Sequence, residues 1–375
     1  KHIPRPPPEP KPPVIPPGDE HQALEQQDQQ LLLDVVRKAF PQCEKYEELK
    51  PVLEGVKEAV FRADWQAAFG SAEGREAWVI KWGAERAVWF ANLLVRVVET
   101  LGDDALFKPL WSKERDEEEE EEGGKDDEDE DDVEPLRVVS FGGGPAEVLA
   151  LAGIIRHFRS DAHGKSKAEL EEEDEDEDAS EIIDLHLANN INWSREISTT
   201  HAALLSPPTL SKYASASAIA NSTPFLSKSA LDLELHRFSA LEASQEEVAE
   251  MVGDEPALIT LFYTVAGLAA TSVAKTVALL LKLTIAAPKG SVVVIFDRAD
   301  DERNAEGKKG YPLRYLLDMA FLGKKPPGEE EEESAKPAWK MLLEDGERVV
   351  KASDGLRHAV LLETGKAQVY VFRRL

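Results

Sequence analysis

The sequence contains very little cysteine: among 375 residues there is one, Cys43. A single thiol forms no intramolecular disulfide and builds no cysteine-rich zinc site, so disulfide-stapled secreted scaffolds and zinc fingers are excluded. This composition fits a reducing compartment, the cytosol or the nucleus. No secretory signal opens the chain, which begins at Lys1 rather than methionine, as expected of a fragment of a longer gene product.

Several catalytic signatures are also missing. The eight histidines have no metal-binding spacing, and neither HExxH nor a GxSxG turn occurs. Carboxylates are abundant, but they crowd into charge runs that hold nothing in a fixed geometry. The sequence therefore predicts no resident metal and no nucleophilic centre, and it assigns no catalytic residue.

The net charge of −28 is local. Residues 114–134, 169–181 and 329–333 hold 31 of the 72 acidic residues and two of the 44 basic ones, so the remainder is close to neutral and compatible with RNA binding. Like charges repel and do not pack, which predicts disordered insertions, either solubilising loops or docking segments for basic proteins.

The chain divides by composition into an extended proline-rich arm (1–20), a helical region (21–112), an acidic loop (113–134) and a main domain (135–375) with acidic insertions at 165–181 and 327–337. Within the helical region, Trp78, Trp82 and Trp89 fall along one predicted helix. They either pack on the main domain or, with Lys81 and Arg86 beside them, form an aromatic platform for bases.

Strands alternate with helices in the main domain, which predicts a mainly parallel sheet. The segment Ala257–Ala274 has no charge for 18 residues, but its β-branched start favours a buried strand and a following helix, through Ile285, over a membrane span. A terminal hairpin is predicted within residues 358–375, with Gly365 in its turn. The predicted strands are Leu136–Phe141, Ile182–Ala188, Leu231–Phe238, Leu258–Val265 and Ser291–Phe296.

The strongest local motif is LRVVSFGGGPAEVLALAG, a buried strand that runs through three glycines into a helix over Ala146–Phe158. Glycines allow close approach of a ligand, Pro145 suits the first helical turn, and the helix N-terminus offers positive potential. The motif favours a nucleotide-like cofactor without separating NAD from S-adenosylmethionine, and a tight turn that serves packing alone is the alternative. In such folds the second strand ends in an acid for the ribose hydroxyls, but here Asn189 stands there, which weakens binding roughly ten- to hundredfold.

The segments SFGGGPAEVLAL, ALITLFYTVAGLAATSVAKTVALLLKLT, GSVVVIFD, GYPLRYLLDMAFL and LLETGKAQVYVFRRL occur in this order. With Trp193 and EAWVIKWGAERAVWFANLL, they resemble the fungal 25S rRNA uridine-N3 methyltransferases from about Gln30 to Leu375. The resemblance implies a Rossmann-like class I methyltransferase sheet, mainly parallel with an antiparallel C-terminal hairpin, behind the N-terminal helical region. It also implies S-adenosylmethionine as cofactor, large-subunit pre-rRNA and assembly factors as partners, and a nucleolar location. The implied cofactor-binding residues are Gly142, Gly143, Gly144, Pro145, Asn189 and Trp193.

Candidate substrate-side residues are Phe262 and Tyr311, which would flank the base, and Asp297, the least unsuitable general base. The alternative is core packing for the two aromatic residues and a helix cap or turn for Asp297. Four segments depart from the family pattern, all at strand ends or in the hairpin turn. These are Asn189 for an aspartate, Ala266-Gly267 for Asn-Glu, residues 298–301 for Ser-Pro-Gly-Ser, and residues 363–368 for Glu-Asn-Met-Arg-Tyr-Gln. Two hypotheses follow: a methyltransferase-fold assembly factor with weak or no catalysis, paired with an active relative, or an active rRNA uridine-N3 methyltransferase.

Overall fold

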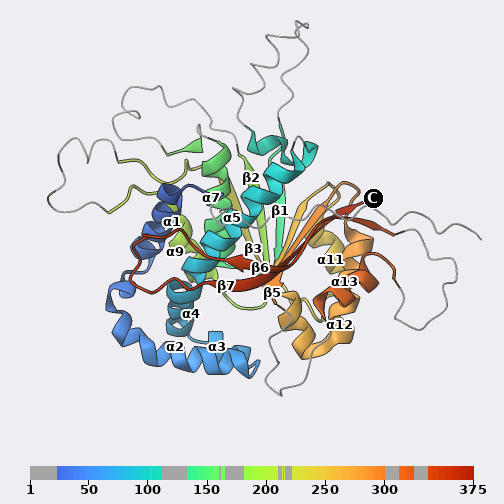
Figure 1. The fold of residues 1–375 in the computed structure, drawn as a ribbon, viewed down its shortest axis with the longest axis horizontal. Coiled ribbons are helices and arrows are strands. Elements are labelled where there is room, and N and C mark those ends of the chain that lie inside the picture. The colour runs from blue at the N-terminus through green and yellow to red at the C-terminus, as the bar shows by residue number, and fades with distance from the viewer. Residues whose placement is uncertain are drawn as a thin grey trace, which may run out of the picture.

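Parallel strands form the centre of a seven-stranded sheet in the order β3-β2-β1-β4-β5-β7-β6 (Figure 1). The computed structural model describes residues 23–102, 104–111, 133–159, 162–164, 181–209, 213, 215, 222–299, 312–324 and 337–375. Strands β1 to β5 pair in parallel, and β7 runs antiparallel to both β5 and β6. The strands are β1 Leu136–Phe141, β2 Ile183–Asn189, β3 Leu231–Arg237, β4 Leu258–Phe262, β5 Val292–Arg298, β6 Trp339–Val350 and β7 Gly365–Arg374.

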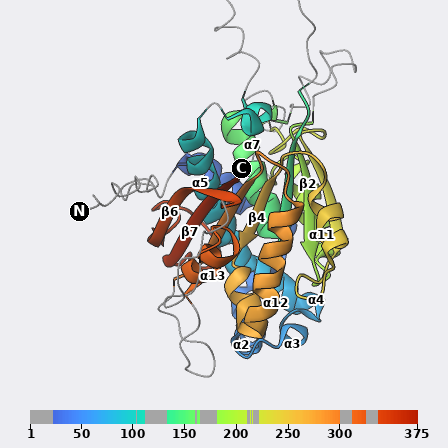
Figure 2. The same cartoon turned by 90° about the vertical axis from the view of Figure 1, so that its right-hand side faces the viewer.

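Helices cover both faces of this sheet, because its central parallel strands are apolar on both sides and must be buried. On one face lie the N-terminal helices together with α7 and α9, and on the other lie α11, α12 and α13 (Figures 1 and 2). The first group is α1 Gln26–Ala39, α2 Tyr46–Phe61, α3 Trp65–Phe69, α4 Ala72–Trp78, α5 Ala84–Leu101, α7 Pro145–Phe158 and α9 Ser194–Leu204. The second is α11 Gln245–Val252, α12 Val265–Ala286 and α13 Leu313–Ala320. Short 3-10 segments, η2 Pro41–Lys45 and η4 Ala105–Leu110, complete the first group.

The N-terminal helices share one apolar core with the sheet. Helix α5 buries Val88, Phe90 and Leu94 in the same cluster as Val148 of α7 and Leu185 of β2. The predicted single tryptophan helix is instead α4 and α5 joined by a π-helical turn, η3 Val79–Gly83. The N-terminal helices are therefore a layer of the same fold.

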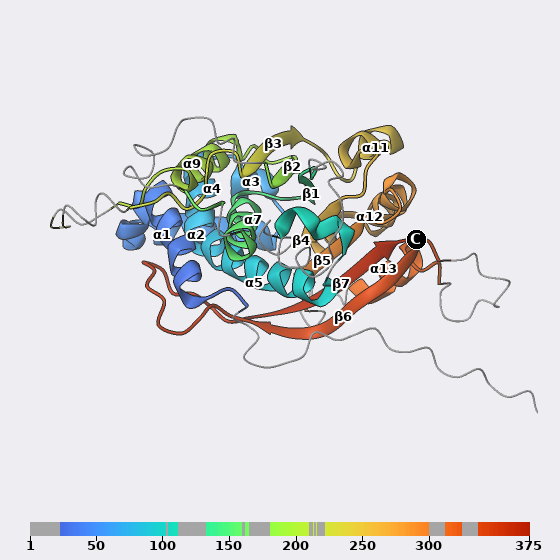
Figure 3. The ribbon, with the colours of Figure 1, turned by 90° about the horizontal axis from the view of Figure 1, so that it is seen from above.

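The terminal hairpin differs from its prediction. Strand β7 begins at Gly365, the residue expected in the turn, and its partner is β6, which lies well upstream. The apolar run before Gly365 belongs to a long connection, residues 351–364, that passes beside α1 (Figure 3). There the Ser353 N–H donates to the Gln29 side chain at 2.9 Å, and the Glu363 N–H donates to Glu85 at 3.0 Å. These contacts keep the segment out of the sheet.

The charge-free segment Ala257–Ala274 is divided between β4 and α12, as predicted. The strand is shorter than predicted, because Tyr263 adopts a φ of 51° that ends it before Val265. Within the described part of the chain, α12 is the one helix whose length and composition alone would let it cross a membrane, with 22% of its apolar window buried. It connects β4 to β5, and Leu279 and Leu283 pack on the sheet. The predicted proline arm and the acidic tracts of residues 114–132, 169–180 and 329–333 lie outside the described residues.

Candidate functional site

The strand order reverses between β1 and β4, and in open α/β sheets ligands bind at the carboxyl ends beside such a switch point. The glycine loop after β1, Asn189 at the end of β2 and Asp297 near the end of β5 all lie at this edge. Helices α3 and α4 close it from the N-terminal side, where the rings of Phe69 and Trp193 lie 5.4 Å apart (Figure 1). The fold thus brings together predicted residues from three separate segments.

The glycine loop satisfies its own N–H groups. Gly142 has a φ of 78° and donates to a main-chain carbonyl of β2 at 2.8 Å, while Gly143 donates to one of β1 at 3.4 Å. Gly144 donates to the Glu147 carboxylate at 2.7 Å. A Cβ on Gly142 would lie 2.5 Å from Thr264 Oγ1, so this glycine is required for the turn itself. The three N–H groups are therefore engaged inside the protein.

The Asn189 side chain also points into this loop. Its amide nitrogen donates to the carbonyls of Gly142 and Gly143, both at 2.9 Å. Its oxygen accepts the N–H of Ile191 at 2.9 Å, and the residue is 7% exposed. Asn189 thus holds the glycine loop through its side-chain nitrogen. Its one side-chain oxygen already accepts a backbone N–H, which leaves one lone pair for a ligand.

Glu147 is a buried acid at the start of α7. Burial raises its pKa to about 7, and the hydrogen bonds from backbone N–H groups together with the charge of Arg86 lower it only in part. The sequence signal for this residue is the capping spacing, in which Gly144 is followed three residues later by a glutamate. Glu147 holds the loop rather than facing it as a free carboxylate.

The predicted substrate-side residues lie deeper than expected. Asp297 is 1% exposed and accepts the N–H of Ala266 at 2.8 Å, so it caps the start of α12. Burial raises its pKa to about 6, against backbone hydrogen bonds and nearby arginines. Phe262 is 4% exposed with its ring 4.5 Å from that of Phe90, a core position. Both match the capping and packing alternatives, whereas Tyr311 lies outside the described residues.

The two remaining predicted residues support the loop. Trp193 is 4% exposed, and a Cβ on Gly144 would lie 3.4 Å from its indole nitrogen. Pro145 occupies the first position of α7, where its lack of an N–H costs nothing. The indole therefore covers the loop at Gly144 and is itself covered by Phe69, whose ring centre is 5.4 Å away.

Arg86 of α5 reaches the same edge from the helical layer. Its guanidinium carbon lies 4.3 Å from the Tyr263 ring centre and 4.8 Å from that of Trp78. Its charge contributes to lowering the pKa of both Glu147 and Asp297, against the larger effect of their burial. Among the described residues it makes no ion pair within 4.0 Å. By contrast, Lys81 is bound to Glu363 at 2.8 Å, and Trp89 is buried, so the predicted aromatic platform is reduced to Trp78 and Trp82.

The sequence model of the family described as "Putative SAM-dependent methyltransferase" matches residues 36–373. The chain belongs to this family. Its sheet order and the helices on both faces are those of the Rossmann-like methyltransferase fold, as predicted. A comparison with curated proteins finds no significant match.

Solved methyltransferases are similar to this family member at low sequence identity. An O-methyltransferase family protein from Burkholderia thailandensis is 9% identical with a TM-score of 0.33, over 91% of this chain and 71% of that one. The CurJ carbon methyltransferase is 10% identical with a TM-score of 0.41, over 90% and 70%. The N-methyltransferase NodS from Bradyrhizobium japonicum, in complex with S-adenosyl-L-homocysteine, is 10% identical with a TM-score of 0.31, over 64% and 78%.

The described residues of this methyltransferase-family chain fit S-adenosylmethionine poorly. A ribose needs an acceptor for its two hydroxyls at the end of β2, where Asn189 has turned its amide into the glycine loop. Glu147 and Asp297 are bound to backbone N–H groups. Arg86 at this edge makes no ion pair with another described residue, and its guanidinium suits a carboxylate or a phosphate.

Proposed function

We propose that this methyltransferase-fold chain acts in assembly of the large ribosomal subunit, where it binds pre-rRNA or assembly factors with weak or no methyl transfer. One observation carries the proposal: within the described chain, the side chains expected to hold the cofactor or move a proton are bound to the protein's own backbone. Asn189 closes the glycine loop, and Asp297 caps α12. A fold with such a site is retained for its surfaces.

The chemistry of the expected substrate supports weak catalysis. Uridine N3 lies on the Watson–Crick edge, so the base must be unpaired, and its proton must leave before or during methylation. A general base must lie within hydrogen-bond reach of that proton. Asp297 has a suitably raised pKa of about 6, but it is 1% exposed and both carboxylate oxygens accept backbone N–H groups. It is therefore a poor candidate for this step.

The RNA and the partners rest on the resemblance to the fungal 25S rRNA uridine-N3 methyltransferases. It supports a nucleolar protein of pre-60S particles and a heterodimer with an active member of the same family. Arg86 would contribute a phosphate contact, and Trp78 and Trp82, with ring centres 4.5 Å apart, a stacking surface for an unpaired base.

An active S-adenosylmethionine-dependent rRNA uridine-N3 methyltransferase is the second candidate. The guanidinium of Arg86, which makes no ion pair with a described residue, favours this second candidate. Stacked on aromatic rings at the switch point, it would donate hydrogen bonds to the carboxylate of the cofactor's methionine part. In this case the cofactor would supply an electrophilic methyl group, and the protein would orient the uridine and receive its proton.

Calorimetric titration of the chain with S-adenosylmethionine separates the two candidates, together with mapping of N3-methyluridine in rRNA of cells that lack the gene. We expect the chain not to bind S-adenosylmethionine in the micromolar range. In cells that lack the gene, we expect unchanged N3-methyluridine in rRNA and accumulation of large-subunit precursors. Micromolar binding and loss of one methyluridine would refute the assembly-factor proposal. A Gly143→Asp variant is a poor control, because a Cβ there would lie 2.4 Å from Ser140 Oγ and disrupt the loop itself.

A further inference from the structure

The outer face of the edge strand β3 is polar and open. Leu231, Leu233 and Leu235 pack toward the α7–α9 side, so the alternate residues point to the opposite face. Among these, Glu234 is exposed and His236 is half-buried, although parallel sheets are normally covered on both sides. Polar side chains at alternate positions of a parallel strand call for an explanation other than packing.

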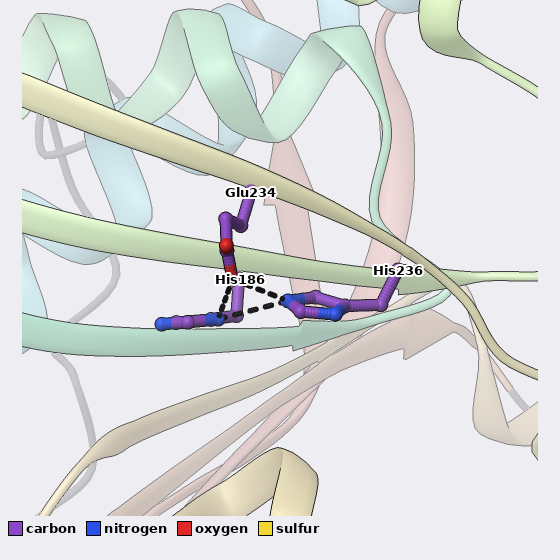
Figure 4. A group of neighbouring side chains, drawn as sticks. All are labelled: His186, Glu234 and His236. Atoms are coloured by element: carbon purple, nitrogen blue, oxygen red, sulfur yellow. Dashed lines mark hydrogen bonds and ion pairs between the residues drawn. The ribbon is translucent and has the colours of Figure 1, made fainter.

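Three side chains on this face point toward one another (Figure 4). His186 of β2 is paired in register with Glu234 of β3, and His236 follows two residues later. His186 Nδ1 lies 2.9 Å from His236 Nε2 and 3.3 Å from Glu234 Oε2, and the last two atoms are 3.1 Å apart. The three atoms thus form a nearly equilateral triangle.

A fourth side chain fixes the orientation of the first imidazole. His186 Nε2 lies 2.9 Å from Asp184 Oδ2, and the same carboxylate oxygen pairs with Arg137 at 3.1 Å. Because Asp184 is held by an arginine, it accepts the N–H of His186 Nε2 and leaves the lone pair of Nδ1 directed at the triangle. A carboxylate behind a histidine in this way is the usual outer partner of a metal ligand.

Two neutral imidazoles would leave a single proton inside the triangle. With both imidazoles neutral, the one N–H of His236 Nε2 faces two acceptors, His186 Nδ1 and Glu234 Oε2, which themselves lie 3.3 Å apart. A cation between the three atoms would satisfy all of them once His236 presents its Nε2 lone pair.

We propose that His186, Glu234 and His236 bind a zinc ion. Two imidazoles and one carboxylate are a common zinc set with an open fourth position, and tetrahedral zinc with ligands at about 2.0–2.2 Å sets the ligand atoms roughly 3.3 Å apart. The edges of 2.9 and 3.1 Å need to open by a few tenths of an ångström, and the edge of 3.3 Å already matches. The Glu234 side chain is 59% exposed, which gives the ion an entry path from solvent.

The proposed zinc would join β2 to the edge strand β3. It lies away from the glycine loop, on the face opposite to α7, and requires neither cofactor nor RNA. Because the ligands come from two strands that pair only after folding, zinc would stabilise the folded chain and leave the unfolded one unaffected. The site holds whether or not the chain transfers a methyl group.

Competition of the chelator-stripped full chain with a zinc indicator dye tests this proposal. We expect one zinc per chain, bound with a dissociation constant of micromolar or lower and with a rise in melting temperature. Asp184→Asn should weaken binding by about 10–100-fold, the typical effect of losing an outer partner, and Glu234→Gln and His236→Ala should weaken it more. His157→Ala, on the other face of the sheet, is the matched control and should bind as the wild type does.

Glu234→Gln keeps the size and exposure of the side chain, so its fold should survive, and far-ultraviolet circular dichroism checks this. X-ray absorption of the zinc-loaded chain should report two imidazole nitrogens. Stoichiometry below one, or unchanged affinity in both Glu234→Gln and His236→Ala, would show that the two imidazoles are a hydrogen-bonded pair only, and would overturn the proposal.

Discussion

Replacing Asn189 with aspartate should move stability and cofactor affinity in opposite directions. The asparagine amide donates two hydrogen bonds of 2.9 Å to the carbonyls of Gly142 and Gly143. An aspartate would lose both donors and present a carboxylate oxygen to two carbonyl oxygens. The loss of two bonds at roughly 1 kcal/mol each, with their carbonyl oxygens left unpaired, adds to about 2–4 kcal/mol of unfolding free energy.

The same substitution would give the site what it lacks. Repelled by the loop carbonyls, the carboxylate would turn toward the cofactor position and accept from both ribose hydroxyls. That gain is worth about ten- to hundredfold in affinity for S-adenosylmethionine, or roughly 1.4–2.8 kcal/mol. Urea denaturation at pH 7 measures the stability, and calorimetric titration measures the affinity. Asn190→Asp, at the exposed neighbouring position, is the control and should change neither by much.

Two results would refute this reasoning. If Asn189→Asp is as stable as the wild type, the amide does not hold the glycine loop. If stability and affinity fall together, the loop closed by Asn189 is the cofactor site itself, and the active-enzyme candidate becomes the better one.

Three further predictions concern the same region. Gly142→Ala should lower the unfolding free energy, measured in urea, by about 1–3 kcal/mol, because its φ of 78° and the crowded position of its Cβ strain any side chain. Gly346→Ala is the control and should be nearly neutral, because no atom lies within 4 Å of its Cβ. Between pH 4.5, its ordinary pKa, and about pH 7, Glu147 takes up a proton on folding, so the stability of the wild type falls as pH rises through this window. Glu147→Gln should remove up to about 3 kcal/mol of that fall between pH 5 and 8. An unchanged slope of stability against pH would contradict the raised pKa. Arg86→Ala should lower the unfolding free energy by about 1–2 kcal/mol, because two cation–π contacts are lost. It should also raise the pKa of Glu147, as measured by nuclear magnetic resonance, whereas Arg86→Lys should retain the charge effect. No upward shift in Arg86→Ala would place the guanidinium elsewhere.

Much of the sheet could be predicted from sequence because its parallel strands are short apolar runs flanked by glycine, proline or charge. Strand β6 could not, since β-bulges between Met341 and Leu343 and between Asp345 and Arg348 break the two-residue alternation that marks a strand. The run before Gly365 resembles a strand because Val360 and Leu361 are apolar. Leu361 is nevertheless 79% exposed, and His358 beside the run binds the carbonyl of Ile80, 278 positions away in sequence.

The sequence predicts where the candidate site lies in the sheet but not how its side chains are oriented. Its glycines and Asn189 follow from strand–loop spacing, yet which way an asparagine amide turns depends on loop carbonyls that spacing does not reveal. The positive φ of Tyr263, which brings its ring over Arg86, has no sequence signature, since tyrosine rarely adopts it. The histidines of the proposed zinc site lie 50 positions apart, and only the register of β2 with β3 brings them together.

The connection of residues 351–364 has a consequence for how the chain is made. Gln29 and Gln30 near the start of the described chain accept N–H groups from Ser353 and Arg357, at 2.9 and 2.7 Å. During synthesis Ser353 emerges from the ribosome 324 residues after Gln29, so the first helix stays incompletely bonded until then. The N-terminal helices therefore complete their hydrogen bonds only when this connection folds back on them, and a truncation before Ser353 would leave them exposed to chaperones and proteases.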